Sequence, residues 1–271
     1  FISPKVQMLL SKITGFNINK IFSPKQVSVT ESPKYKLVTD EQLRELQEGS
    51  LKGANKLLQM PPYKKPWNIH NNDELIISND QQIAHFEMDD STYVFTDISP
   101  GIPRRDRMLV VRDKEGVLRR CNREESDKIL MLYYPQEGKM YNMPQMFQPQ
   151  QLEVLLGKHQ YEYVLNVACV QFEPDDPNYT RVTERTFEHV LQSGQFEVLR
   201  FTRFYGSMVF YFLIHNKIDL LLAHQLSQNR LDDAVSLVQL YHIIHPYCKS
   251  VAICKGEDAK DNYQLIQVSF F

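Results

Sequence analysis

Seven arginines lie within twenty residues near the middle of the chain, and arginine is the side chain best suited to binding phosphate. The seven are Arg104, Arg105, Arg107, Arg112, Arg119, Arg120 and Arg123. A planar guanidinium group donates two parallel hydrogen bonds to phosphate oxygens and stays charged throughout the physiological pH range. These arginines are therefore the candidate RNA-binding residues of the chain, through contacts to phosphate.

The same arginines also have an ordinary interpretation as the solvated surface of a hairpin. Asp106, Asp113 and Glu115 lie among them and can form ion pairs with some of them. Residues 101–149 hold ten basic and seven acidic residues, so the positive excess is three. Charge alone does not decide between the two interpretations.

A small α+β unit, predicted over residues 91–148, positions these arginines. Its predicted strands cover residues 92–98, 107–113 and 117–121. The hairpin turn falls at Lys114–Gly116, and Asn122 with Glu125 forms a capping box that opens a helix ending at Pro135. Because side chains alternate between the faces of a strand, some of the arginines share one face.

Four histidines raise the question of a zinc site. His242 and His245 are three residues apart on a predicted helix, with His215 and His224 nearby in the sequence. A zinc hydrolase of the H-E-x-x-H type carries a glutamate base between its histidines, whereas the residues between these two are both isoleucine. We interpret His242 and His245 as helix-end residues that suit the negative end of the helix dipole, and we expect no metal.

An acidic group at Glu173, Asp175 and Asp176 lies in a loop between two prolines. Calcium loops spread their oxygen ligands over about twelve residues around a central glycine, and that pattern is absent. We interpret the group as a solvated turn that caps the next helix. The chain also lacks the glycine-rich phosphate loops of nucleotide-binding proteins and the G-x-S-x-G motif of hydrolases. We therefore expect no enzyme activity, no cofactor and no small-molecule substrate.

Composition narrows the class of protein further. The chain has 271 residues, of which 31 are basic and 33 acidic, so a globally basic nucleic-acid binder is excluded while a local basic patch is not. No segment reaches the length of a membrane span. The four cysteines are scattered, which favours reduced thiols in an intracellular protein over a disulfide scaffold. They are Cys121, Cys169, Cys248 and Cys254.

A helical domain is predicted over residues 149–247. Its most apolar part is Leu199–Phe212, where apolar side chains occupy every face of a helix and Arg200 and Arg203 lie near the start. A helix that is apolar all round is buried. The predicted helices cover residues 183–193, 196–215, 217–228 and 231–245. The short connections between them favour an antiparallel bundle or array.

An N-terminal arm with two helices and irregular linkers is predicted over residues 1–90. Ser3 and Gly15 bound its first helix, and a Thr39–Gln42 capping box opens the second, which ends before Pro61. The linkers are residues 16–38 and 61–90, and a C-terminal tail over residues 248–271 ends in a predicted strand at 264–271. The fold class is therefore mainly α, with a C-terminal helical bundle, a small β-hairpin unit in the middle and an extended N-terminal arm.

Several segments also carry a family resemblance. They are Val6–Phe22, Tyr35–Thr39, Met60–Pro62, Tyr93–Ser99, Ile102–Arg107, Val110–Arg112, Gln171–Asp175, Leu199–Phe212, Lys217–Asp219 and Asp232–Pro246. In this order they resemble the family of mitochondrial small ribosomal subunit protein twenty-two, a metazoan, mitochondrion-specific ribosomal protein family without a bacterial counterpart. The resemblance covers roughly nine-tenths of the chain and weakens in residues 63–90 and after Pro246.

The resemblance implies a structural constituent of the mitochondrial small ribosomal subunit that supports mitochondrial translation. Its implied partners are the mitochondrial small-subunit rRNA and neighbouring ribosomal proteins, and its implied place is the mitochondrial matrix, reached through a cleaved transit peptide. The chain begins at Phe1 rather than at a methionine, which is compatible with such cleavage. The residues alone leave two alternatives: a helical adaptor protein in another intracellular complex, and an enzyme with an unrecognised site.

Overall fold

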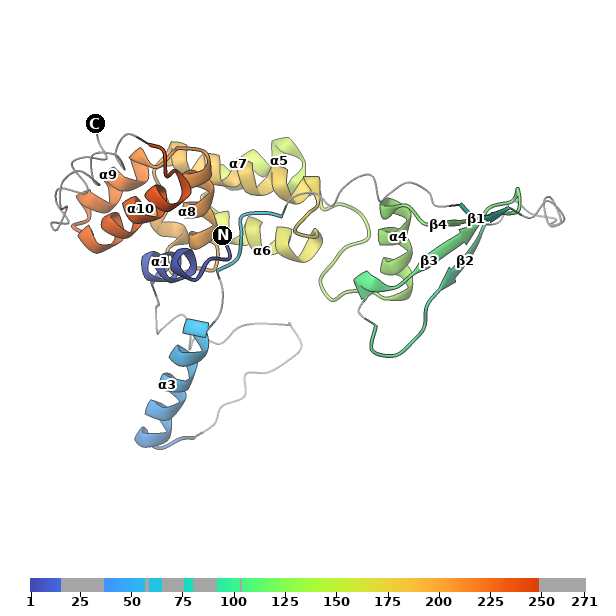
Figure 1. Cartoon of the computed structure of the whole chain (residues 1–271), viewed down its shortest axis with the longest axis horizontal. Helices are drawn as coiled ribbons and strands as arrows, with labels where there is room; N and C mark the ends of the chain where they lie inside the picture. Colours follow the sequence, from blue (N-terminus) through green and yellow to red (C-terminus); the bar gives the residue numbers. More distant parts are fainter. Residues whose placement is uncertain (16–36, 57–58, 65–75, 80–91, 103, 249–271) are drawn as a thin grey trace.

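A computed structural model of the chain describes residues 1–15, 37–56, 59–64, 76–79, 92–102 and 104–248; at residues 54–56, 105 and 123 it describes the backbone alone. Two bodies are visible in Figure 1, a helical body and a smaller sheet unit. Helix α3 (Asp40–Lys56) stands away from both of them. Residues 16–36 of the predicted linker 16–38, the predicted strand at 264–271 and Cys254 lie outside the described residues.

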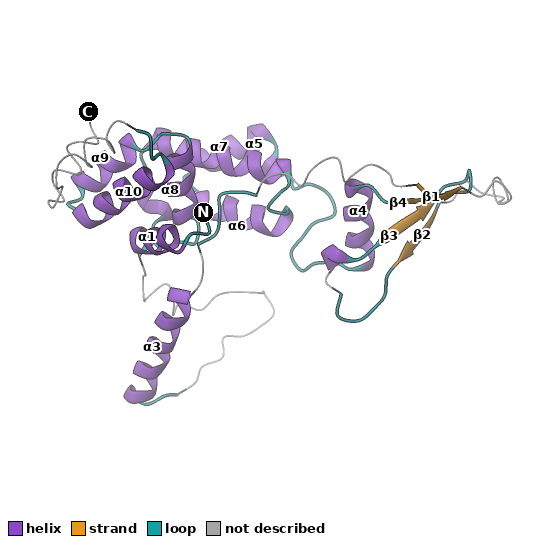
Figure 2. Cartoon of the chain, viewed as in Figure 1, coloured by secondary structure: helices purple, strands orange, loops and turns teal. Residues whose placement is uncertain are grey.

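The mainly helical fold class is confirmed. The helical body contains α1 (Pro4–Thr14), α5 (Pro149–Gly157), α6 (Tyr161–Gln171), α7 (Pro177–Ser193), α8 (Tyr205–Ile214), α9 (Asp219–Ser227) and α10 (Leu231–Ile244), with 3₁₀ turns η4 (Gln145–Phe147) and η5 (Phe196–Leu199). The sheet unit contains β1 (Ile76–Asn79), β2 (Tyr93–Thr96), η3 (Arg104–Asp106), β3 (Leu109–Arg112), β4 (Val117–Arg120) and α4 (Arg123–Tyr133). All the described strands lie in the sheet unit, as Figure 2 shows by colour.

Helix α8 is the centre of the helical body. Nine of its ten residues are buried, from Tyr205 to Leu213, which agrees with the prediction from its all-round apolar sequence. Helices α1 and α10 both pack against it. Helix α1 buries Val6, Leu10 and Ile13 there, so the first helix of the predicted arm shares one core with the C-terminal helices. The sequence predicted this helix but not its place in the fold.

Residues 59–64 cross the helical body as an extended segment. The backbone N–H of Gln59 donates to the side-chain oxygen of Gln7 at 2.7 Å, and the Ser207 hydroxyl donates to the carbonyl of Met60 at 2.8 Å. Further on, the N–H of Lys64 donates to the carbonyl of Pro174 at 2.9 Å. These hydrogen bonds attach the segment to α1, α8 and the loop before α7.

The predicted helix over residues 196–215 is wrong in its first half. The structure has the 3₁₀ turn η5 and then a bend before α8 begins at Tyr205. Phe201 adopts φ = 64°, a left-handed conformation that is uncommon outside glycine and breaks a helix. Thr202 supports the bend, since its hydroxyl donates to the carbonyl of Leu199 at 2.6 Å and accepts from the N–H of Phe204. Apolar periodicity hides such a bend because buried turn residues are apolar as well.

The acidic loop before α7 was predicted as a solvated turn that caps a helix, and the structure corrects half of this. Asp176 is the N-cap, and its carboxylate accepts from the N–H of Asn178 at 2.7 Å. Asp175 is instead buried, at 3% exposure. The helix also begins at Pro177 rather than near 183, because proline suits the first turn of a helix.

The sheet unit is an antiparallel sheet with the strand order β1-β4-β3-β2. The predicted hairpin of β3 and β4 is confirmed, as is the capping box that Asn122 and Glu125 form at the start of α4. The strand β1 corrects the prediction of an irregular connection over residues 61–90. It has four residues and pairs at the edge of β4 through a bulge between Ile76 and Ser78, so it depends on that partner strand rather than on its own sequence.

The remaining predictions about helix caps are confirmed at some helix ends and not at others. The box between Thr39 and Gln42 forms at the start of α3, with both hydrogen bonds at 3.4 Å. Ser3 occupies the N-cap of α1 without a side-chain hydrogen bond, and Gly15 ends that helix with φ = 67°. A side chain at Gly15 would meet the ring of Phe201 at 3.2 Å, so both its conformation and this close approach require glycine.

The loop after α4 connects the two bodies. Met140 and Gln171 exchange two hydrogen bonds of 2.9 Å, backbone N–H to side-chain oxygen and side-chain N–H to carbonyl. Phe147, fully buried, packs its ring 4.9 Å from that of Phe172. The loop is thus attached to α6 before the chain enters α5.

Candidate nucleic-acid interface

The sheet has one face covered by a helix. Leu109 and Val111 of β3 are buried together with Leu130 of α4. In an antiparallel ladder, directly opposite residues point to the same face, and Val111 lies opposite both Val94 and Arg119. Arg119 therefore lies on the covered face, beside the start of α4.

Arg119 is engaged in ion pairs inside the sheet unit. It donates to Asp113 at 2.8 Å and, with two parallel hydrogen bonds of 2.8 and 2.9 Å, to Glu125. Its side chain is 12% exposed. The hydrogen bonds to Glu125 and Asp113 raise the pKa of Arg119, and the hydrogen bonds from Arg119 lower the pKa of the Glu125 carboxyl although burial opposes this. Arg119 thus joins the β4 strand to α4, and its charge is balanced locally.

Arg107 and Arg104 hold the loop that precedes β3. The Arg107 guanidinium lies 4.4 Å from the ring centre of Tyr134 and donates to the carbonyl of Asp97 at 2.6 Å. Hydrogen bonds from Ser99, and the nearby Arg107, lower the pKa of the Asp97 carboxyl. Arg104 donates to the side-chain oxygen of Gln136 at 2.9 Å. These contacts keep the segment around η3 next to the end of α4.

The opposite face of the sheet, which we name the open face, carries two aromatic residues and two arginines. Its members are Tyr93 and Phe95 of β2, Val110 and Arg112 of β3, Leu118 and Arg120 of β4, and Ser78 of β1. Tyr93 is 44% and Phe95 50% exposed, and Arg120 is exposed. The described helix that packs on this sheet, α4, lies on the other side.

The register arranges the open face in two rows. One row runs Phe95, Val110, Arg120 across β2, β3 and β4, and the next runs Tyr93, Arg112, Leu118 and continues to Ser78 of β1. Each row therefore combines an aromatic ring with a guanidinium group. The Nε of Arg112 is buried and makes no hydrogen bond within the described part of the chain. A donor left in this state is costly unless an acceptor reaches it.

The structure does not gather all seven predicted arginines on one surface. Arg112 and Arg120 lie on the open face, Arg119 on the covered face, and Arg104 and Arg107 in the loop before β3. The backbone places Arg105 in η3 and Arg123 at the start of α4. Contact with RNA stays a prediction for all of them. Sequence reasoning overlooked Tyr93 and Phe95 as site residues, although their alternation along strand 92–98 was a usable signal.

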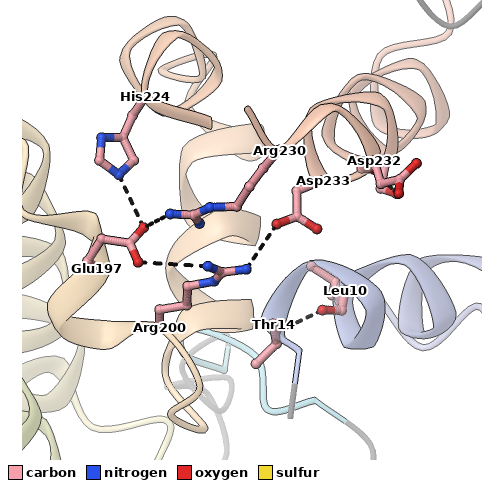
Figure 3. A network of polar contacts seen from close by, with 9 residues as sticks. Leu10, Thr14, Glu197, Arg200, His224, Arg230, Asp232 and Asp233 are labelled. Carbon is pink, nitrogen blue, oxygen red and sulfur yellow. Dashed lines mark hydrogen bonds and ion pairs between the residues drawn. The ribbon is translucent and has the colours of Figure 1, made fainter. Parts of the chain in front are cut away.

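A second charged cluster lies in the helical body, and Arg200 is part of it. Figure 3 shows Glu197 of η5 contacting three basic side chains, namely Arg200 at 3.9 Å, His224 at 3.2 Å and Arg230. Arg200 also contacts Asp233 of α10 at 3.3 Å. Burial raises the pKa of Glu197, but hydrogen bonds from Arg230 and His224 outweigh it and leave that pKa lowered. The cluster links η5, α9 and α10, so its charges serve the fold.

Other charged and histidine residues noted in the sequence make contacts within the helical body. Arg203 donates to Asn166 at 2.7 Å, and the ring nitrogen of His245 contacts the carbonyl of Leu213 at 2.8 Å. His215 packs against Tyr211, with ring centres 4.3 Å apart. In the described ranges, no three His, Cys, Asp or Glu residues gather as a metal site would require. No helix within those ranges combines the length and apolar character needed to cross a bilayer.

Comparison with known proteins identifies the family. Residues 1–246 match the family described as "Mitochondrial 28S ribosomal protein S22". The chain is 39% identical over 268 residues to "Small ribosomal subunit protein mS22" of Bos taurus, covering 99% of this chain and 73% of that relative. It is 38% identical over 271 residues to the protein of the same name from Mus musculus, with the same coverage. The chain therefore belongs to the mitochondrial 28S ribosomal protein S22 family.

Proposed function

We infer that this chain is a structural constituent of the small subunit of the mitochondrial ribosome, and that its sheet unit contacts the rRNA of that subunit. The observation that carries the ribosomal role is the family match over residues 1–246, together with relatives that are named as small ribosomal subunit proteins. The family places the protein in the mitochondrion as part of the ribosome. Contact with rRNA is a separate proposal, which the family match does not supply.

The charge distribution supports contact between the sheet unit and rRNA. The ion pairs of the helical body are internal, whereas the open face presents Arg112 and Arg120 without a carboxylate among its described strand residues. Arginine on an uncompensated surface attracts phosphate. The sheet unit is therefore the better candidate for RNA, and the helical body for a scaffold.

Neighbouring ribosomal proteins are the second class of partner we propose. Exposed apolar side chains lie close together in the sequence from the end of α4 to the loop before η4, where four large residues are each more than half exposed. They are Leu132, Tyr133, Met140 and Tyr141. Apolar surface of this kind, concentrated in one stretch, is typical of protein–protein contact sites.

Sedimentation of the tagged full chain from mitochondria tests the proposal. We expect the chain to travel with small-subunit rRNA through a sucrose gradient and to remain there after a mild salt wash. A chain found at the top of the gradient, or in a complex without that rRNA, would contradict the ribosomal role and favour an adaptor in another assembly.

A further inference from the structure

We propose that the open face binds unpaired nucleotides, with bases stacked on Phe95 and Tyr93 and phosphates contacted by Arg112 and Arg120. The proposal rests on the rRNA contact inferred above and narrows it to single-stranded RNA at a defined surface. The observation behind the proposal is the arrangement in two rows across the strands, because each row contains one exposed aromatic ring and one arginine.

The aromatic residues argue for bases. Phe95 and Tyr93 are 50% and 44% exposed and point to the same side of an outer strand. Two residues apart on one strand, they lie about 6.8 Å from each other. Stacking on aromatic rings is the usual way in which proteins hold splayed bases of single-stranded RNA, and it needs no particular sequence. Bases inside a duplex have both faces covered by their neighbours.

The arginines argue for a polyanion rather than an apolar protein surface. Arg112 lies directly opposite Tyr93, and Arg120 lies two strands away from Phe95, about 10 Å along the row. Two nearby carboxylates are engaged elsewhere, because Asp113 and Glu125 both bind Arg119 on the covered face. A phosphate chain running beside stacked bases would supply negative charge to these two arginines.

Equilibrium binding of the full chain to a labelled polyuridine strand, and to the same strand annealed to its complement, tests the proposal. We expect the single strand to bind more tightly than the duplex. Phe95→Ser should weaken single-strand binding about ten-fold, as the loss of one base–aromatic stack does. Arg120→Gln should weaken it several-fold and reduce its salt dependence.

Matched controls come from exposed residues of the helical body. Tyr163→Ser removes an aromatic ring that is 54% exposed on α6, and Lys158→Gln removes an exposed cation after α5. Neither should change RNA binding. Denaturant unfolding of each variant establishes that the substituted side chains leave the fold intact.

Three outcomes would overturn the proposal. One is equal single-strand binding by Phe95→Ser and Tyr163→Ser, and another is duplex binding as tight as single-strand binding. The third is that Phe95→Ser leaves RNA binding intact but releases a neighbouring protein from the particle, which would make the open face a protein interface. Each of these leaves the ribosomal role standing if the chain still sediments with small-subunit rRNA, so the two proposals fail separately.

Discussion

The helical body and the sheet unit differ in how much apolar and charged surface each leaves exposed. In the helical body, apolar side chains from α1, α6, α7, α8 and α10 form one buried cluster, and the charged residues around Glu197 balance one another. In the sheet unit, one face is buried under α4 and the other exposes aromatic rings and arginines. The contrast teaches that a scaffold and a contact surface can be told apart by what they leave exposed, since the scaffold buries its large apolar side chains and pairs opposite charges, whereas the contact surface exposes rings and arginines.

The largest expected effect separates buried from exposed aromatic residues. Phe204 is 1% exposed beside the centre of the helical body, so Phe204→Ala should reduce the free energy of unfolding by about 3–5 kcal/mol. Phe95→Ala on the open face should change it by less than about 0.5 kcal/mol. Urea titration of the full chain measures both. Similar losses from the two substitutions would show that the open face is part of a folded core.

A smaller effect distinguishes the two faces of the sheet. Arg119→Gln removes the cation shared by Asp113 and Glu125, and we expect it to lower the free energy of unfolding by about 1–2 kcal/mol. This loss is smaller than that of a fully buried ion pair because both carboxylates are partly exposed. Arg120→Gln, one residue along, should stay within about 0.5 kcal/mol. Denaturant unfolding gives the comparison. If Arg120→Gln destabilised the chain more, the assignment of faces would be reversed.

The two arginine faces should also differ in RNA binding, in the opposite order. The double variant Arg112→Gln and Arg120→Gln should lower the slope of log affinity against log salt by about 1.4, which corresponds to two phosphate contacts on a single strand. Arg119→Gln should leave that slope unchanged because its charge is balanced by Asp113 and Glu125. A salt titration with polyuridine reports the slopes, and equal slopes for the two variants would count against the open face.

The smallest effect concerns acid stability of the helical body. The pKa of Glu197 lies below its ordinary value of 4.5 in the folded chain, so its ion pairs stabilise the fold fully above that value and lose their effect as pH falls through the folded pKa. Glu197→Gln should cost about 1 kcal/mol near neutral pH, since the carboxylate is nearly half exposed. The variant should also lose less stability on acidification than the parent. Equal losses of stability by the variant and the parent on acidification would contradict this prediction.

Much of the fold follows from local sequence signals. The Asn122–Glu125 box, the hairpin turn before β4 and the apolar sequence of α8 each predicted the element observed. These features depend on residues that are neighbours in the chain. The bend at Phe201 and the short strand β1 could not be predicted, because one depends on tertiary packing and the other on an edge offered by β4.

The candidate site was predictable in composition but not in arrangement. The cluster of arginines identifies the segment, yet the sequence does not say that Arg119 turns to α4 while Arg112 and Arg120 turn away. One residue of register decides the face on which a side chain lies. For the same reason the placement of Tyr93 and Phe95 beside these arginines required the pairing of β2 with β3.

Ultraviolet cross-linking of purified small subunits, followed by mass spectrometry of the cross-linked peptides, tests the central claim most directly. The claim is that the chain contacts rRNA through the open face while the helical body serves as a scaffold. We predict cross-links to RNA in peptides that contain β2, at Tyr93 or Phe95, with other ribosomal proteins in the same sample as positive controls. RNA cross-links confined to residues 149–247, with β2 peptides recovered unmodified, would contradict it.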